Sequence, residues 1–306
     1  MSVVIFGSIN MDLAIATPRL PLPGETITGS NFLSAPGGKG ANQAVAASRL
    51  GVNTQMVGRV GADGFGEKLL ESLATAGVET RGVSISDRSS SGIAVIAVGG
   101  SGENSIIVVP GANGDIDETD SDRLKDLLPG KTALLLQLEI PLEAVISAAK
   151  AAKEIGVKVI LDPAPFREDI PADLYKLIDI ITPNEIEASQ LVGFRVNNPE
   201  TAKKAAQELR RRGVEVAIVK LGARGVICVC ENQTLFIPGF PVDAVDTVAA
   251  GDAFNGGLAA AIDRGLSLRE AVKWGAAAGA LCATKSGAQS AMPDKETFED
   301  FLSKLG

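Results

Sequence analysis

The segment from Asp246 to Gly257, DTVAAGDAFNGG, places a carboxylate among small residues at the expected start of a helix. The amino end of a helix presents unpaired backbone N–H groups and the positive end of the helix dipole. Because Ala249, Ala250 and Gly251 are small, a ligand can approach these N–H groups closely. The segment therefore predicts an anion-binding site of the kind that holds phosphates.

Asp252 is the unusual residue of this segment, because a carboxylate occupies the position that suits an anion. A carboxylate beside an anion site can take a proton from a hydroxyl group that attacks a phosphoryl group. The alternative is that Asp252 only caps the helix, as Asp often does. The segment by itself leaves both interpretations open.

A second glycine-rich loop, PGGKGAN at residues 36–42, introduces an Ala-rich helix. It is similar to a phosphate loop, but Gly40 follows the lysine where Ser or Thr is required, and the first glycine of that motif is absent. One alternative is a sugar-binding loop, in which backbone N–H groups, Lys39 and Asn42 bond to hydroxyl groups. The other is a simple turn.

The composition excludes several classes of function. The 306-residue chain contains no histidine, which excludes Ser-His-Asp and Cys-His catalysis and histidine-ligated metal sites. Its formal net charge of −8 argues against nucleic acid as a main partner. No apolar run approaches the ~20 residues that cross a membrane, and no basic leader precedes the first predicted strand. We therefore expect a cytoplasmic protein, or an organellar one from which a transit peptide has been removed.

Strand and helix patterns alternate along most of the chain. Apolar runs that predict buried strands cover residues 3–7, 54–60, 132–138, 157–161, 178–182 and 216–221, and helical patterns lie between them. Such alternation implies a mainly parallel sheet with helices on both faces, which is a three-layer α/β/α fold. We expect a single domain over residues 1–306.

Two segments, about 13–34 and 92–109, interrupt this alternation. The first contains a stretch dense in Pro and Gly and the strand-like TITGSNF, and the second predicts two strands around a GGSGEN turn. Each follows the expected carboxyl end of a strand. We expect the two segments to form a small β-sheet lid over one crevice.

Polar residues gather where the predicted strands end. In open parallel sheets, ligands bind at the carboxyl ends of the strands. If the sheet is wound as expected, one rim carries Asn10, Asp12, Glu139, Asp162, Asn184, Glu185, Glu187, Lys220 and Asp252. This convergence favours the catalytic interpretation of Asp252.

Together these motifs resemble the ribokinase-like, or phosphofructokinase-B-type, family of carbohydrate and nucleoside kinases. The resemblance extends from Val3 to Leu302. It rests on the two glycine-bearing signatures at residues 37–51 and 246–257, and on GSINMD, LLQLEIPLE, ITPNEIEA, VKLGARG and SGAQSAMP in matching order. It implies an enzyme that transfers the γ-phosphate of ATP to the 5-hydroxyl group of ribose.

The resemblance also implies roles for individual residues. Asp252 would be the general base, and the backbone of Ala249, Ala250, Gly251 and Asp252 would stabilise the developing charge. The sugar would be held by Asn10, Asp12, Gly38, Lys39, Gly40, Ala41, Asn42, Glu139 and Asp252. ATP would lie against Asn184, Lys220, Leu221, Gly222, Ala223, Arg224, Gly225, Gly251, Asp252 and Ala276. Asn184 and Glu187 would position Mg²⁺ through waters, since that ion keeps much of its hydration.

A monovalent-cation site beside the anion site is a further implication, with K⁺ as the activator. The matching ligands are Asp246, Val248, Cys282, Lys285, Gly287 and Ala291. At Ala291 the family commonly has a serine whose hydroxyl group contributes, so we expect K⁺ activation that persists but is weaker. Lys220 also departs from the family, which usually has a small polar residue there. The family's lid forms a dimer contact, so we expect a homodimer through the lid.

Two alternatives stay open. A kinase of this family could act on fructose, deoxyribose or a nucleoside such as adenosine, although the Asn10–Asp12 spacing and Glu139 favour ribose. A lid whose only aromatic residue is Phe32 offers little surface for stacking a nucleoside base. The second alternative, a non-catalytic sugar-binding regulator, is disfavoured because the base and the magnesium pair are both present.

Overall fold

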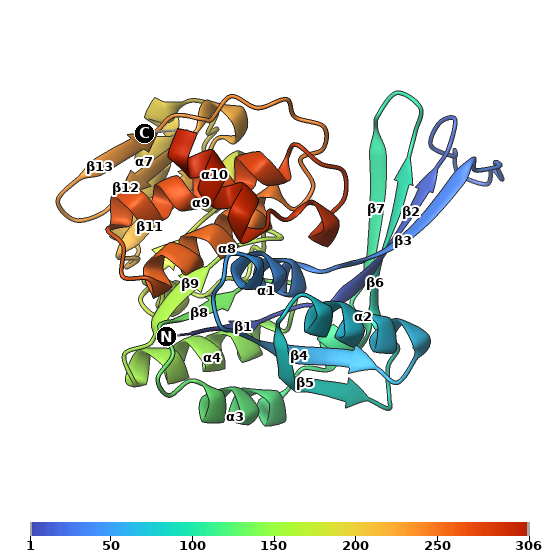
Figure 1. Ribbon diagram of the computed structural model, residues 1–306, viewed down its shortest axis with the longest axis horizontal. Coiled ribbons are helices and arrows are strands. Elements are labelled where there is room, and N and C mark those ends of the chain that lie inside the picture. The colour runs from blue at the N-terminus through green and yellow to red at the C-terminus, as the bar shows by residue number, and fades with distance from the viewer. Residues whose placement is uncertain (1, 305–306) are drawn as a thin grey trace.

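A nine-stranded sheet forms the centre of the protein in the computed structural model, which describes residues 2–304 (Figure 1). Residues 1, 305 and 306 of the domain predicted over 1–306 lie outside the described residues. The strand order is β13 (Thr234–Ile237), β12 (Val226–Val229), β11 (Val216–Lys220), β10 (Ile180–Ile181), β9 (Lys158–Leu161), β8 (Ala133–Leu136), β1 (Val3–Phe6), β4 (Thr54–Gly61) and β5 (Glu79–Ser86). All neighbouring strands from β11 to β5 run parallel, and β12 is antiparallel to both of its neighbours.

Helices cover both faces of this sheet, because successive strand residues point to opposite sides. Val3 and Ile5 belong to one buried cluster, while Val4 and Phe6 belong to the other. The first cluster includes residues of α1 (Lys39–Arg49), α2 (Gly64–Thr75), α8 (Ala250–Asp263), α9 (Leu268–Cys282) and α10 (Lys295–Lys304). The second includes residues of α3 (Glu118–Leu127), α4 (Leu142–Glu154), α5 (Ala172–Tyr175), α6 (Glu185–Val192) and α7 (Pro199–Arg211). The three-layer α/β/α prediction is confirmed.

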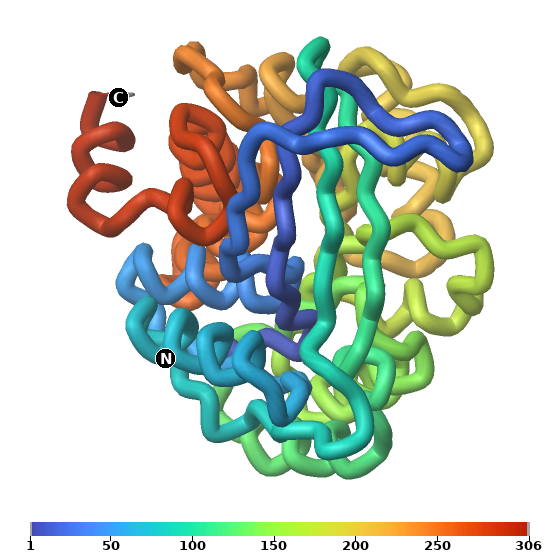
Figure 2. The backbone as a smooth tube through the Cα atoms, turned by 90° about the vertical axis from the view of Figure 1, so that its right-hand side faces the viewer, coloured from blue at the N-terminus to red at the C-terminus, as the bar shows by residue number. Residues whose placement is uncertain are grey.

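A second sheet of four strands stands beside the main body, and Figure 2 shows its strands side by side. Their order is β3 (Asn31–Gly37), β2 (Asn10–Ala16), β6 (Gly92–Val98) and β7 (Asn104–Val109). The small additional sheet is therefore confirmed, with two corrections. Residues 26–30 of the strand-like TITGSNF form no strand. The pairing of β2 with β3 ends at Ala16 and Asn31, two residues before Pro18, which lacks the N–H group that a ladder needs.

The second correction concerns Asn10 and Asp12, which were expected to trail the first strand. Both belong to β2 of the small sheet. The chain leaves β1 after Phe6, and the side chain of Asn113 then bonds to the N–H and the carbonyl group of Ile9. These bonds replace a strand ladder at the point where the chain passes from one sheet to the other. No helix within residues 2–304 is long and apolar enough to span a membrane.

Candidate active site

Asp252 lies in the first turn of α8, and its carboxylate faces into the protein. The side chain is 5% exposed, and it makes no capping bond to the helix. Instead it accepts hydrogen bonds from Asn42 Nδ2 at 3.0 Å and from Gln43 Nε2 at 3.1 Å. The capping interpretation of Asp252 is therefore wrong. These bonds fix the orientation of the carboxylate.

The backbone in front of α8 takes an unusual conformation. Ala249 has φ 57° and ψ 7°, and it is the only non-glycine residue with positive φ within the described range 2–304. Left-handed backbone costs a non-glycine residue about 1–2 kcal/mol. The helical hydrogen bonds begin at Ala253, whose backbone N–H donates to the carbonyl of Ala249 at 2.9 Å. The N–H groups of Gly251 and Asp252 precede the intrahelical ladder and suit an anion, while that of Ala250 bonds to the carbonyl of Thr247 at 3.3 Å.

Burial raises the pKa of Asp252 to about 6. The positive charge of Lys39 opposes this effect, the negative charge of Asp162 adds to it, and the hydrogen bonds from Asn42 and Gln43 oppose it. A carboxyl group with this pKa is ionised near neutral pH, yet it is a stronger base than an ordinary aspartate.

Gln43 connects Asp252 to a second buried carboxylate. Its Nε2 atom also donates to Asp162 Oδ2 at 3.1 Å, and its Oε1 atom accepts from Gln137 Nε2 at 2.7 Å. No role for Gln43 was predicted, although a polar residue in a run of alanines is a signal that could have found it. The helices α1 and α8 approach closely here, because a methyl group on Gly256 would lie 2.4 Å from the Ala46 Cβ.

Glu139 collects the segments that were predicted to hold a sugar. Its Oε2 atom accepts from Ser8 Oγ at 2.5 Å, from the backbone N–H of Lys39 at 3.3 Å, and from Asn10 Nδ2 at 3.5 Å. The loop before α1 needs glycine at Gly38, which has φ 90° and where a Cβ would lie 2.6 Å from the backbone nitrogen of Asn10. Glu139 thus contacts both the segment between β1 and β2 and the glycine loop before α1.

Asp12 lies close to this group of polar residues, near enough for the charge of Glu139 to affect its carboxyl group. A Cβ on Gly37 would lie 2.1 Å from Asp12 Oδ2, so only glycine leaves room for the carboxylate. Burial raises the pKa of Asp12 to about 7, with further contributions from the charges of Glu139 and Asp252. Asn10, two residues earlier in β2, accepts a 2.7 Å hydrogen bond from Asn113 Nδ2. Asn113 was missed because it lies about 100 residues further along the chain, in the 3₁₀ helix Gly111–Asp115.

Lys39 supplies positive charge between the acidic residues. Burial alone would lower the pKa of its ammonium group, but nearby carboxylates outweigh burial and raise this pKa. They are, in decreasing order of effect, Asp252, Asp162, Glu139 and Glu187. Gly40 and Ala41 are buried beside it in α1, and a Cβ on Gly40 would lie 2.8 Å from the backbone of Gly7.

Asn184 and Glu187 form a capping box at the start of α6. The Asn184 side chain accepts from the N–H groups of Ile186 and Glu187, and the Glu187 carboxylate accepts from the backbone N–H and the Nδ2 of Asn184, both at 2.8 Å. Burial raises the pKa of Glu187, and the charge of Asp162 adds to this effect. A largely buried carboxyl group such as that of Glu187 suits a cation nearby.

The predicted nucleotide segment begins at the end of β11. Lys220 pairs with Asp162 at 3.1 Å, and it forms an isolated parallel bridge with Asn184. Leu221 is buried, while Gly222, Ala223 and Arg224 form an exposed 3₁₀ turn that closes at Gly225. Arg224 forms an ion pair with Glu185 of α6. The partly buried Ala276 packs against the first hydrophobic cluster from α9.

The profile of the pfkB family of carbohydrate kinases matches residues 1–295. This chain belongs to the pfkB carbohydrate kinase family. A ribokinase of Haemophilus influenzae is 42% identical and covers 98% of each chain. A deoxyribokinase of Salmonella typhimurium is 35% identical over 99% of each chain. Among solved structures, Arabidopsis thaliana ribokinase complexed with ribose and ATP is 35% identical, with a TM-score of 0.91 and 98% coverage of each chain.

Most of the residues expected to bind a monovalent cation also lie close to one another. Asp246 Oδ1 accepts from the backbone N–H of Val248, and Asp246 Oδ2 accepts from that of Gly287, both at 3.0 Å. The thiol of Cys282 lies 3.8 Å from the carbonyl oxygen of Val248, and the N–H of Lys285 bonds to the carbonyl of Cys282 at 3.2 Å. Ala291 is buried and offers only a methyl group.

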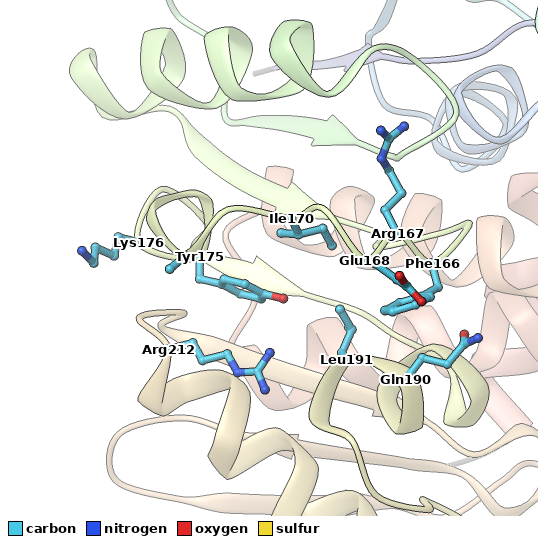
Figure 3. A pocket seen from close by; sticks show the side chains of 10 residues that line it. Phe166, Arg167, Glu168, Ile170, Tyr175, Lys176, Gln190, Leu191 and Arg212 are labelled. Carbon is cyan, nitrogen blue, oxygen red and sulfur yellow. The ribbon is translucent and has the colours of Figure 1, made fainter.

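A hollow of about 600 Å³ lies away from these kinase residues (Figure 3). Arg167 and Lys176 point outward at opposite ends of it, and Arg212 lies near the Tyr175 ring, 5.6 Å from its centroid. Each basic side chain has a local acidic partner: Asp169 for Arg167, Asp173 for Lys176 and Glu208 for Arg212. None of the residues that line this hollow was predicted to bind the nucleotide.

Proposed function

We propose that this chain transfers the γ-phosphoryl group of ATP to the 5-hydroxyl group of D-ribose, giving ribose 5-phosphate and ADP. The observation that carries the proposal is the pair formed by Asn42 of the glycine loop and Asp252 of the anion site. This hydrogen bond links the candidate base to the loop proposed to hold the sugar, which supports the proposal. The 42% identical ribokinase and the Arabidopsis ribokinase structure with ribose and ATP support the same reaction.

The sugar would bind against Asn10, Asp12, the loop from Gly38 to Asn42, and Glu139. These groups offer several directional donors and acceptors, which a sugar needs because its hydroxyl groups lose water on binding. The Oδ1 atom of Asn42 is buried and has no hydrogen-bond partner within residues 2–304. A sugar hydroxyl group is a suitable donor to that atom, since an unpaired buried acceptor is costly.

The chemical step would take place at the start of α8. The 5-hydroxyl oxygen forms a bond to the γ-phosphorus, the bond from this phosphorus to the bridging oxygen of ADP breaks, and Asp252 takes the hydroxyl proton. The N–H groups from Ala249 to Asp252 would stabilise the charge on the transferred group, and a base of this kind contributes roughly 10²–10⁴-fold in rate.

ATP would lie along residues 220–225, with Ala276 near the adenine. Mg²⁺ would be positioned through waters by Asn184 and Glu187, where it would neutralise phosphate charge. The donor set fits an indirect contact. No group of three or more acidic or thiol side chains among residues 2–304 could hold a metal ion by itself, and the Glu187 carboxylate already bonds to Asn184.

K⁺ would bind beside the anion site, among Asp246 and the carbonyl groups of Val248, Cys282, Lys285 and Gly287. The close contacts between these segments fit such a site, because the Asp246 carboxylate accepts hydrogen bonds from the backbone N–H groups of Val248 and Gly287 and so lies where the two loops meet. Ala291 lacks the oxygen that a serine would add. We infer activation by K⁺ that is weaker than a complete set of ligands would give.

A homodimer would form through the small sheet, on the face that carries Asp12. Cross-strand register places Leu33, Ile96 and Ile106 in one row of this face, next to Asp12. Leu33 is 58% exposed and Ile106 is 53% exposed. An apolar sheet surface of this kind is typical of an interaction site.

The second candidate substrate is deoxyribose, which the 35% identical deoxyribokinase of Salmonella typhimurium favours. A coupled assay of ADP release with ribose, deoxyribose, fructose and adenosine tests both proposals. We expect the highest kcat/KM with ribose. A higher kcat/KM with deoxyribose than with ribose would make deoxyribose the preferred substrate. Ribose binding without ADP release would favour a non-catalytic sugar-binding protein.

A further inference from the structure

A buried ion pair connects two strands at the edge of the active site. Asp162 follows β9 and Lys220 ends β11, so the pair passes over the carboxyl end of the intervening strand β10. Lys220 Nζ lies 3.1 Å from Asp162 Oδ1, and the two side chains are 12% and 3% exposed. The second oxygen of Asp162 accepts from Gln43, the residue that also bonds to Asp252. The ion pair is thus one side chain away from the candidate base.

The ammonium group of Lys220 lies at the amino end of α8. A methyl group added to Gly251 would lie 3.3 Å from Lys220 Nζ. The same ammonium group lies 5.9 Å from the centroid of the Phe254 ring, near the start of the helix. Lys220 therefore adds a full positive charge to the space that the N–H groups of Gly251 and Asp252 face.

An ion pair at this depth is a poor device for stability, because removing two charges from water costs as much as their attraction returns. A site for ATP, in contrast, needs positive charge. The surrounding carboxylates are Asp12, Glu139, Asp162, Glu187 and Asp252, and the positive groups named near them are Lys39 and Lys220. Without Lys220, Asp162 would present an unpaired negative charge to the phosphates.

We propose that Lys220 is a further catalytic residue, which contacts the transferred phosphoryl group, and that Asp162 is the positioning residue that holds its ammonium group in place. The inference rests on the proposed function, since it assigns Lys220 to the γ-phosphate of ATP. During transfer Lys220 keeps its protons and offers N–H donors to the phosphoryl oxygens as the bond to ADP breaks. Asp162 touches neither substrate.

The test compares Lys220→Met, Asp162→Asn and the double variant with the wild type. We expect Lys220→Met to lower kcat by roughly 10²–10³-fold, the loss typical of one donor to developing charge. The affinity for AMP, which lacks the transferred group, should stay within about twofold. Lys220→Arg should recover part of the turnover. Because the Asp162 substitution acts through Lys220, adding it to Lys220→Met should lower kcat little further.

Lys153→Met is the matched control. Lys153 forms a similar 2.5 Å pair with Asp179, before the start of β10, and its loss should leave kcat unchanged. The double variant removes both charges of the Lys220–Asp162 pair, so it guards against misfolding caused by an orphaned carboxylate. Wild-type turnover in either Lys220→Met or the double variant would overturn the proposal, as would a parallel loss of AMP affinity.

Failure of the proposed function can be told apart from failure of this inference. Wild-type turnover of ribose with ATP is measured first. If it is absent, the affinities of the wild type and Lys220→Met for adenylyl imidodiphosphate and AMP decide the role of Lys220. Weaker binding of the triphosphate analogue alone supports it, and equal affinities overturn it.

Discussion

Asn42 and Asp252 are 210 residues apart in the chain, yet Asn42 Nδ2 donates a 3.0 Å hydrogen bond to Asp252 Oδ2. The bond joins the first turn of α1 to the first turn of α8. A sugar held by the loop before α1 would therefore meet the base and the anion site at once. This juxtaposition, rather than either glycine-rich segment alone, supports the proposed site for phosphoryl transfer.

Asp252→Asn should abolish most turnover while sparing sugar binding. Without the carboxylate no group takes the proton of the hydroxyl, so we expect kcat to fall roughly 10²–10⁴-fold. Calorimetric titration should give a dissociation constant for ribose near that of the wild type. Asp263→Asn, at the far end of α8 where Asp263 bonds to Thr132, is the control with unchanged kcat. Undiminished turnover would remove Asp252 from the mechanism.

The pH profile should report two raised pKa values. Asp252 acts in its ionised form, and burial raises its pKa to about 6. Asp12, with a pKa of about 7, accepts best from sugar hydroxyl groups when ionised. Hence kcat/KM with ribose should level off above about pH 8 and fall as the pH drops through 7, more steeply below pH 6. Asp12→Asn should remove the upper bend, and a flat profile from pH 5 to 8 would contradict both assignments.

Ala249 should tolerate glycine and reject a β-branched residue. Its left-handed backbone at φ 57° is strained for alanine, so Ala249→Gly should raise the free energy of unfolding by about 1 kcal/mol and keep kcat. Ala249→Val should lower both stability and kcat, because valine disfavours this conformation. Ala253→Gly, inside α8, is the matched comparison and should lose about 1 kcal/mol in urea unfolding. Equal losses for both glycine variants would contradict the role of Ala249.

The sequence predicted the elements that carry a strong local signal. The glycine loop before α1, the small residues before α8 and the apolar parallel strands each depend on neighbouring residues, and all are where they were expected. By contrast, β5 and α3 were not predicted. Edge strand β5 alternates irregularly between buried and exposed positions, and α3 is mostly polar. Neither offers the apolar run or stripe from which an element is recognised.

The hydrogen-bond network of the site could not be predicted from local sequence patterns. Gln43 bonds to Asp162 and Asp252, which are 119 and 209 residues away, and no periodicity encodes such contacts. The same holds for Asn113, which fixes Asn10 across the start of the small sheet. The positions of Asp162 and Lys220 at the ends of predicted strands did indicate that both lie at the rim of the sheet. Their pairing required the strand order, which places β9 and β11 on either side of β10.

Ala291→Ser should strengthen activation by K⁺. Ala291 is buried, and a serine hydroxyl group at this position would add the oxygen ligand that the proposed cation site lacks. We expect the ratio of kcat with K⁺ to kcat without it to be larger in Ala291→Ser than in the wild type. Ser290→Ala is the control, because that side chain is exposed and donates a hydrogen bond to the carbonyl of Ser286. If wild-type activity in buffer free of K⁺ and Na⁺ equals that with added K⁺, the cation proposal is wrong.

Ile106→Asp should separate the proposed dimer. Ile106 pairs with Ile96, and through it lies in the row of Ala14 and Leu33, on the face that carries Asp12. A charge there would lose water on association, so light scattering after size-exclusion chromatography should report a monomer. Ile107→Asp is the matched control, since the next residue of β7 points to the other face and is as exposed. A monomeric wild type, or a dimer that survives Ile106→Asp, would contradict an interface on this face.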